Sequence, residues 1–392
     1  MTTKNDQLGE TRMRITKLLG SAALALLPMA APVLAQDAAT ELPPCDGCSD
    51  SMVIMSWGGA YQNSQLKAYV EPYQALTGIT VTWDESSNEA IAKLRAAQEA
   101  GNMPYDLVDV EGPDSQRACD EGLAAEIDFD EALAPGSDGS SVEDDFGDSL
   151  INDCFVPQIY FSTTFGYRTD VAEWNGQTPD DICDIFDTAT FPGKRSLQAS
   201  PKKNLEWALV CDGVPADQVY DVLDTPEGVD RALAKLDTIK DDVIWWTAGA
   251  ETPQLLADKE VVMGSTYNGR LFSVIAEEKQ PVAMLWDYEN FDFDGWIVPA
   301  GLDEARMNRV MHFLRFATDT QRLADQAKYI AYGPARASSQ PLVSTHIDLG
   351  IEMAPFMPTN PDNMKNYLVN NIEWWSDHQD EVEAKFQAWL GQ

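Results

Sequence analysis

The sequence predicts an α/β protein of two lobes, each a doubly wound sheet flanked by helices. Length is the first observation, since 392 residues are more than one compact hydrophobic core usually holds. The second is the order of the elements, because short apolar strands alternate with helical stretches, as in sheets covered by helices on both faces. The third is composition: 44% hydrophobic and 23% charged residues are the proportions of an ordinary globular protein.

The N-terminal part contains three expected strands, which are residues 52–55, 79–83 and 106–110. The helix after the first strand ends near Leu76, because Gly78 supplies a stop. Ser86 and Glu89 have the spacing of a capping box, which predicts the start of the next helix. This order of strands and helices predicts one doubly wound unit.

Later strands are expected at residues 159–167, 260–264, 282–286 and 297–299. Thr225 followed by Pro226 marks a helix start, because Pro is favoured at the first helical position, and this helix extends to Lys240. Residues 307–317 and 380–390 carry apolar side chains at helical spacing, which predicts two further helices.

The first 35 residues have the pattern of a signal peptide. Basic residues precede an apolar run at 18–27 that is too short to span a bilayer, and Val33-Leu34-Ala35 is a small-residue cleavage site. We therefore expect residues 1–35 to be removed and the protein to be periplasmic. Met13 is an alternative start, since a compact signal also begins there. Gln36 rather than Cys follows the cleavage site, so no lipid anchor is expected.

The net charge of −37 limits the possible partners. It argues against nucleic acid, which requires a basic surface, and it permits attraction of cationic solutes. The acidic run at residues 128–148 is expected to be an exposed loop.

Six cysteines in an exported chain favour disulfides over metal binding or catalysis. Several pairings are open, and the favoured one is Cys45–Cys48, Cys119–Cys154 and Cys183–Cys211. The first pair resembles half of a zinc knuckle, but no second half completes it. It is expected to close a small loop in a flexible tail at residues 36–50.

No enzyme motif is present, so neither catalytic residues nor a cofactor is expected. The three histidines, His312, His346 and His378, form no HExxH motif, and there is no nucleophile elbow, Walker loop or dinucleotide fingerprint. Residues 290–295 imitate the start of a calcium loop, but Gly301 stands where its closing Glu belongs. A secreted hydrolase with two distant carboxylates remains an alternative class.

Five motifs occur in order along the chain, and they are residues 56–62 (SWGGAYQ), 105–108 (YDLV), 191–195 (FPGKR), 267–270 (YNGR) and 330–334 (IAYGP). Together they resemble the spermidine/putrescine-type periplasmic solute-binding proteins of ABC importers, which are bacterial extracellular solute-binding proteins. The resemblance extends from Met52 to the C-terminus. It implies a type II-like periplasmic-binding-protein fold, a ligand trapped between the lobes by hinge closure, and delivery to a membrane permease with its ATPase. Such proteins usually act as monomers.

The resemblance also implies how the lobes divide the chain. Residues 51–156 and 295–335 form lobe 1, and residues 157–294 and 336–392 form lobe 2. The chain is expected to cross between the lobes near residues 156–160, 291–295 and 334–339.

Polyamine sites in this family pair aromatic rings with carboxylates, because carboxylates hold ammonium groups and rings cover the methylenes. Carried over by position, the ligand contacts are Trp57, Glu111, Tyr267, Asp294, Tyr332, Glu373 and Trp374 (or its neighbour Trp375). Trp246 is a further candidate that either lines the cleft or packs in the core.

One stretch departs from the polyamine pattern. Lys202 and Lys203 stand where polyamine binders carry acidic contacts. The main expectation is a small cationic solute such as putrescine or spermidine. The alternative is an amino-acid or opine-like solute whose carboxylate pairs with Lys202 or Lys203, unless both lysines lie on the surface.

Overall fold

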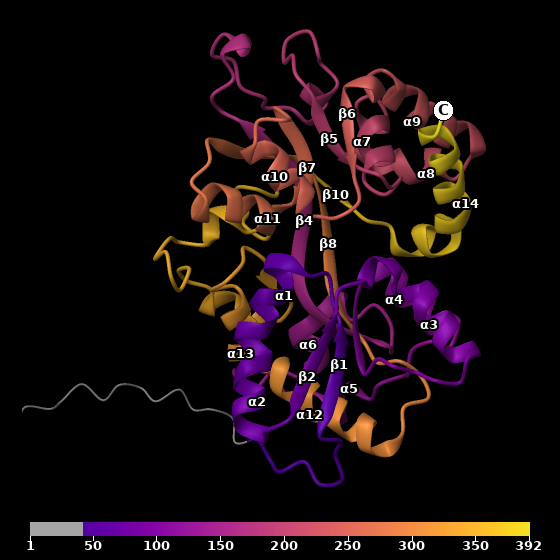
Figure 1. Ribbon diagram of the computed structural model, residues 1–392, viewed down its shortest axis with the longest axis vertical. Coiled ribbons are helices and arrows are strands. Elements are labelled where there is room, and N and C mark those ends of the chain that lie inside the picture. The colour runs from indigo at the N-terminus through magenta and orange to yellow at the C-terminus, as the bar shows by residue number, and fades with distance from the viewer. Residues whose placement is uncertain (1–41) are drawn as a thin grey trace, which may run out of the picture. The chain divides into compact units, whose positions relative to one another are not determined.

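The computed structural model describes residues 42–392, which form an α/β fold on a mixed ten-stranded sheet (Figure 1). The strand order is β2-β1-β3-β8-β4-β7-β5-β6, with β10 paired to β8 and β9 paired to β4. The strands are β1 (Ser51–Met55), β2 (Thr80–Asp84), β3 (Leu107–Glu111), β4 (Phe155–Arg168), β5 (Arg195–Gln198), β6 (Val243–Trp246), β7 (Met263–Tyr267), β8 (Val282–Ile297), β9 (Gly333–Pro334) and β10 (Tyr367–Val369). The predicted α/β class is confirmed.

The helices of the described residues are short, apart from α12 and the long α14. They are α1 (Gly59–Gln65), α2 (Glu71–Thr77), α3 (Ala90–Glu99), α4 (Gly112–Asp120), α5 (Phe129–Ala132), α6 (Val142–Phe146), α7 (Asn204–Val210), α8 (Val219–Leu223), α9 (Pro226–Asp237), α10 (Glu251–Ala257), α11 (Asn268–Phe272), α12 (Glu304–Ala317), α13 (Thr320–Gln326) and α14 (Ile372–Leu390). Among residues 42–392, no helix combines the length and apolar composition that a membrane span requires.

Two long antiparallel strands, β4 and β8, pair with each other over most of their length. The parallel group β2-β1-β3 joins one end of β8, and the parallel group β7-β5-β6 joins the far half of β4. The sequence predicted a separate sheet for each lobe. Instead, β4 and β8 continue from one group to the other and join both into one hydrogen-bonded network (Figure 1).

Strand β8 corrects the sequence prediction of two strands separated by an acidic and aromatic stretch. The stretch is itself extended, with Phe291 and Phe293 on one face and Asp292 and Asp294 on the other. This alternation has the period of a strand. Acidic side chains hid the signal, because buried carboxylates are uncommon unless partners offset their burial.

The predicted lobe crossings lie side by side in the sheet. Ile159 of β4 pairs with Asp294 of β8 and also with Pro334 of β9. The three segments at which the chain was expected to cross between lobes therefore meet at one place, whereas the exact lobe boundaries stay a prediction.

Several local signals are confirmed and others are wrong. The helix after β1 ends at Gly78, whose φ of 74° suits glycine, and Thr225 caps α9 by accepting a hydrogen bond from the Gly228 amide. Ser86 stands at the N-cap of a short 3-10 helix, Ser87–Glu89, but its side chain makes no capping hydrogen bond. Its hydroxyl donates to Asp84 instead, and α3 begins later, at Ala90.

Two more predictions are corrected. The strand expected at 260–264 is β7, which begins only at Met263 and extends to Tyr267. The acidic run at 128–148 contains α5 and α6 rather than only an exposed loop, and Asp145 within it is buried against Arg336 at 2.8 Å. A buried guanidinium therefore compensates an acidic side chain that looked like part of a solvated surface.

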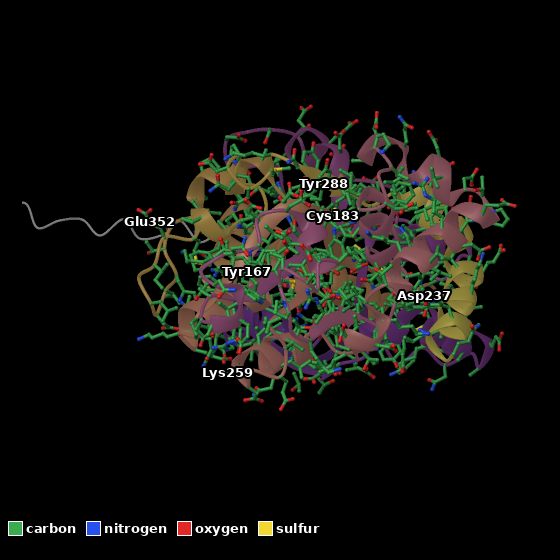
Figure 2. All side chains as sticks on the ribbon, turned by 90° about the horizontal axis from the view of Figure 1, so that it is seen from above. Tyr167, Cys183, Asp237, Lys259, Tyr288 and Glu352 are labelled. Atoms are coloured by element: carbon green, nitrogen blue, oxygen red, sulfur yellow. A yellow bond between two sulfur atoms is a disulfide. The ribbon has the colours of Figure 1, made fainter. Side chains whose placement is uncertain are left out.

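All three favoured disulfides are confirmed: Cys45–Cys48, Cys119–Cys154 and Cys183–Cys211 (Cys183 is labelled in Figure 2). Just beyond the first of them, Ser49 donates its amide to Ala305 O at 2.9 Å and accepts from Arg309 Nε at 2.8 Å. Residues 42–50 form no helix or strand. Residues 1–41, which include the predicted signal peptide, lie outside the described residues.

Candidate ligand-binding site

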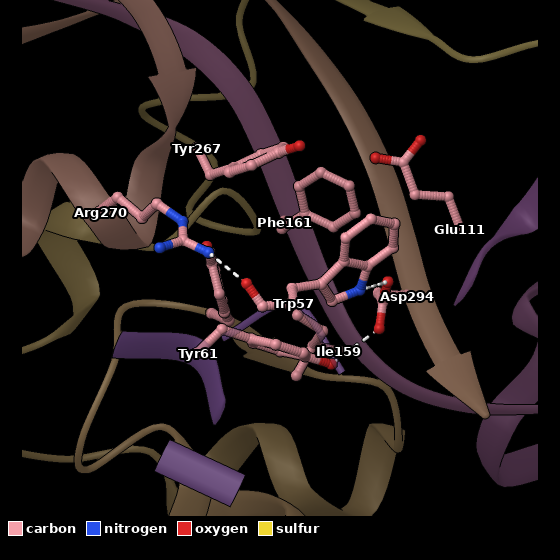
Figure 3. A pocket seen from close by; sticks show the side chains of 9 residues that line it. Trp57, Tyr61, Glu111, Ile159, Phe161, Tyr267, Arg270 and Asp294 are labelled. Carbon is pink, nitrogen blue, oxygen red and sulfur yellow. Dashed lines mark hydrogen bonds between the residues drawn. The ribbon is translucent and has the colours of Figure 1, made fainter. Parts of the chain in front are cut away.

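A pocket opens where β3, β4, β7 and β8 meet the segments that follow β1 and precede β9 (Figure 3). Its volume is about 290 Å³, part of which is open to solvent. The lining residues are Trp57, Tyr61, Glu111, Ile159, Phe161, Tyr267, Arg270, Asp294 and Tyr332.

Aromatic rings form the walls of the pocket. Phe161 of β4 meets the ring of Tyr267 edge to face at 5.6 Å and that of Tyr332 at 6.2 Å. Tyr61 of α1 meets Tyr332 at 5.8 Å. Edge-to-face rings hold one another in fixed positions, so the walls are preformed and apolar. Trp57, directly after β1, adds its indole to this cage (Figure 3).

Asp294 lies at one end of the cage. Its Oδ2 accepts a hydrogen bond from Trp57 Nε1 at 2.8 Å, and its Oδ1 accepts one from the Tyr61 hydroxyl at 2.7 Å. Burial raises the pKa of Asp294 well above its usual value, and the nearby charge of Asp109 raises it further. No cationic side chain among the described residues forms an ion pair with Asp294 within 4 Å.

Asp109 is a second buried carboxyl group close enough to Asp294 for its charge to affect it. It accepts hydrogen bonds from Gln65 Nε2 at 2.8 and 3.0 Å. Burial raises the pKa of Asp109 to about 7. The two carboxyl groups therefore disfavour each other's ionisation, and a cation placed beside Asp294 would relieve that effect.

Glu111 ends β3 and faces the pocket, but its charge is already matched. Lys203 Nζ donates to both Glu111 oxygens, at 3.0 and 3.2 Å, and lies 3.7 Å from Asp292. Burial opposes ionisation of Glu111, yet the charges of Lys203 and Lys202 outweigh it and lower the Glu111 pKa. Glu111 is therefore an ionised residue of the pocket wall whose negative charge is compensated by Lys203 and Lys202.

Arg270 of α11 supplies the opposite charge at the other end. In Figure 3, Trp57 and Phe161 lie between its guanidinium and Asp294. Arg270 is 6% exposed, its Nη2 makes only long contacts with Trp57 O (3.4 Å) and Gly58 O (3.5 Å), and its Nε has no partner. No carboxylate among residues 42–392 pairs with it within 4 Å. A buried guanidinium without a counter-ion is costly, which is expected where a ligand supplies the anion.

The fold holds Arg270 in place through the start of its helix. Asn268 Oδ1 accepts from the Ser162 amide at 3.0 Å, and Asn268 Nδ2 donates to Phe356 O at 3.0 Å and to Ala331 O at 2.5 Å. Side chains larger than glycine at Gly59 and Gly249 would meet the guanidinium, at 2.7 and 2.9 Å. These glycines leave the room that Arg270 occupies.

The structure brings together five of the eight residues predicted as ligand contacts. Trp57, Glu111, Tyr267, Asp294 and Tyr332 all line the pocket. Burial raises the pKa of Tyr267 to about 12 and that of Tyr332 further still, so both hydroxyls are neutral hydrogen-bonding groups.

The other three predicted contacts do not share this lining. Trp246 is fully buried and packs edge to face against Tyr267 at 6.1 Å, behind the pocket wall. Glu373 and Trp374 begin α14 and line a separate surface hollow, where Trp374 stacks on His378 at 4.9 Å. Helix α14 begins at Ile372, with Asn371 as its N-cap, and the hollow that its first turn lines shares no residue with the cage.

Sequence reasoning missed Tyr61, Ile159, Phe161 and Arg270. Two of these stand inside motifs that it had singled out: Tyr61 lies in residues 56–62, and Arg270 lies in residues 267–270. It assigned a possible solute carboxylate to Lys202 or Lys203. Neither lysine lines the pocket. Lys203 is hydrogen-bonded to Glu111, and Lys202 lies 4.0 Å from Glu111 and 3.9 Å from Asp114.

Comparisons with known proteins agree on the class of this fold. The chain is 34% identical to the gamma-aminobutyric acid-binding protein of Pseudomonas aeruginosa over 342 residues, which cover 87% of this chain and 91% of that protein. The structure of a GABA receptor matches with 31% identity and a TM-score of 0.72, covering 87% of this chain and 97% of that one. The PBP MotA from A. tumefaciens B6, in complex with glucopine, matches with 27% identity and a TM-score of 0.76, covering 87% and 99%.

These neighbours are two-lobed periplasmic binding proteins, so the predicted two-lobed fold class is confirmed. The model of the family "Bacterial extracellular solute-binding protein" matches residues 68–358. The chain therefore belongs to the bacterial extracellular solute-binding protein family and is the substrate-binding component of an ABC importer.

Proposed function

We propose that this protein captures a short zwitterionic amino acid of the γ-aminobutyrate (GABA) type. The guanidinium of Arg270 binds the carboxylate, Asp294 binds the ammonium group, and the aromatic cage covers the methylenes between them. The observation that carries the proposal is that, among residues 42–392, Arg270 has no carboxylate partner and Asp294 has no cationic partner, at opposite ends of one apolar pocket. Charge-assisted hydrogen bonds at both ends would orient the solute and set the length that fits.

This assignment departs from the polyamine expectation and favours the amino-acid alternative. A diamine in the same pocket would press its second ammonium group against Arg270, and like charges in a buried site repel strongly. Two similar proteins, a GABA-binding protein and a GABA receptor, support the same choice. The ligand's carboxylate partner is then Arg270, in place of Lys202 or Lys203.

The rest of the role follows from the family. The solute would bind between the lobes, closure would bury it, and the closed form would be recognised by a permease whose partner ATPase drives import. We place this cycle in the periplasm, after removal of residues 1–35, and we assign no chemical step to the protein. The binding protein itself is proposed to act as a monomer.

Titration calorimetry of residues 36–392 tests the proposal with four ligands of similar length. GABA has both charged ends, butyrate lacks the ammonium group, butylamine lacks the carboxylate, and putrescine replaces the carboxylate end with a second ammonium. We expect GABA to bind at least about tenfold more tightly than any of the other three, since each lost charged contact costs about 1.5–3 kcal/mol. Equal or tighter binding of putrescine would refute the amino-acid assignment.

A further inference from the structure

One face of the sheet beside the pocket carries four carboxylates. Glu111 of β3 stands opposite Asp294 of β8 in the antiparallel register, and Asp109 and Asp292 are each two residues away on the same strands. All four side chains are buried. Like charges directly opposite one another destabilise a sheet, so this face requires cations.

Lys203 is the cation that contacts two of them. Its ammonium donates to Glu111 at 3.0 and 3.2 Å and lies 3.7 Å from Asp292, and the Lys203 side chain is only 3% exposed. It also lies 5.5 Å from the centre of the Phe161 ring, which is part of the aromatic cage. Lys203 therefore stands directly behind the pocket wall without lining the pocket.

The backbone holds Lys203 there at a conformational cost. Its φ is 72°, a region that residues other than glycine seldom occupy. The turn is fastened by the Asn204 side chain, whose Nδ2 donates to Gln198 O and to Ser200 O, both at 2.8 Å. The turn therefore fixes the position from which the Lys203 side chain reaches Glu111 and Asp292.

We propose that Lys203 is a specificity-determining residue: it neutralises Glu111, the second carboxylate that lines the pocket, so that Asp294 alone is left to receive an ammonium group. The site then accepts a solute with one ammonium and rejects a diamine. This inference rests on the proposed function and adds to it the group that sets the charge of the site.

Among the described residues, the positively charged hydrogen-bond donor to Glu111 is Lys203, and the hydrogen-bond donors to Asp292 are neutral. Asp292 has neutral donors in Asn370 Nδ2 and the Phe293 amide, at 2.8 and 2.9 Å. Among the described residues, Glu111 side-chain oxygens are hydrogen-bonded only to Lys203. Without Lys203, the remaining cation near Glu111 would be Lys202, 4.0 Å away and without a hydrogen bond to it, so Glu111 would present a less compensated negative charge to the pocket beside Asp294, and two adjacent carboxylates would favour a dication.

The variant Lys203→Met tests the inference through a ratio of dissociation constants, putrescine over GABA. We expect this ratio to fall at least about tenfold relative to the wild type. An effect on lobe closure alone would move both constants together and leave the ratio unchanged. Lys202→Met is the matched control, because Lys202 lies 4.0 Å from Glu111 without a hydrogen bond to it, and its ratio should stay within about threefold of the wild type. An unchanged ratio in Lys203→Met would overturn the inference.

The double variant Glu111→Gln/Lys203→Met provides a second measurement that does not depend on folding of the single variant. It removes one negative and one positive charge, so we expect its ratio to stay within about threefold of the wild type. A shift of tenfold or more in the double variant would overturn the inference, since Lys203 would then act other than through Glu111. Wild-type protein that binds no GABA would refute the proposed function and the inference together. GABA binding with an unchanged ratio in Lys203→Met would refute the inference alone.

Discussion

At the scale of single residues, this site depends on ionisable groups that are buried before a ligand arrives. Arg270 lacks a carboxylate partner among the described residues, and Asp294 lacks a cation. Each is held by neutral hydrogen bonds or by aromatic packing instead. Preorganised charges of this kind contribute to binding because the ligand does not have to order them.

Arg270→Gln should remove the partner of the solute's carboxylate while keeping a polar side chain in the same space. We expect GABA affinity to fall by about 2–3 kcal/mol, on the order of 100-fold, whereas butylamine, which has no carboxylate, should lose little. Calorimetry with both ligands checks this. Equal losses for the two ligands would show that Arg270 supports the fold of the pocket rather than the carboxylate.

The raised pKa of Asp294 predicts a pH dependence of binding. In the free protein, Asp294 holds its proton above the usual range for an aspartate, whereas an ammonium ligand requires the ionised form. Binding should therefore release a proton, and GABA affinity should increase with pH, by up to about tenfold per unit while Asp294 is protonated in the free protein.

Calorimetry between about pH 5 and pH 8, where GABA itself stays zwitterionic, measures this dependence. Running each pH in two buffers of different ionisation enthalpy counts the released proton directly. Asp294→Asn serves as the comparison, since it cannot ionise and should bind weakly with a flatter profile. Affinity of the wild type that falls as pH rises would contradict the assignment of Asp294.

At the scale of elements, strand β8 connects the fold to the site. It brings Asp294 against Glu111 of β3 and Ile159 of β4, and Gly295 lies next to it where the strands are closest. A Cβ on Gly295 would lie 2.3 Å from Val156 O and 2.7 Å from the Phe155 ring. No side chain fits there unless β4 and β8 separate.

Gly295→Ala should therefore destabilise the protein by about 1–3 kcal/mol, as overpacking does, and should weaken GABA binding through displacement of Asp294. Gly391→Ala is the control, because its nearest neighbour would be Gln387 O at 3.5 Å and little change in stability is expected. Urea unfolding compares the two variants. Equal stability of Gly295→Ala and wild type would show that the strands separate there at no cost.

At the scale of the whole molecule, binding and stability are linked. A ligand that binds only the folded state at a hundred times its Kd should stabilise the protein by about 2.7 kcal/mol. If the pocket closes around the solute, as in hinge-closing proteins, the protein should also contract.

Small-angle scattering should show a smaller radius of gyration with saturating GABA than without ligand. Arg270→Gln at the same GABA concentration should keep the ligand-free value, because its affinity is too low for saturation. A wild-type radius that does not change on saturation would argue against hinge closure in this protein.

Much of this organisation could be predicted from local patterns. Gly78 ended a helix and Thr225 capped one, because both effects act within a few residues. The three disulfides were favoured among several open pairings and are confirmed. Five pocket residues were selected by resemblance, and the structure brings those five together, while their contacts with a ligand remain a prediction.

What the sequence by itself determined is therefore the α/β class, the family resemblance and the residues of the cage that lie at strand ends. Only the tertiary structure decided that Lys203 neutralises Glu111, that Arg270 has no carboxylate partner among the described residues, and that Glu373 and Trp374 lie elsewhere. The physical reason is that a charge acts through distance and burial. Distance and burial both depend on which of the strands β3, β4, β7 and β8 become neighbours. Glu111 and Lys203 are more than 90 positions apart, so no local sequence pattern predicts that they form an ion pair.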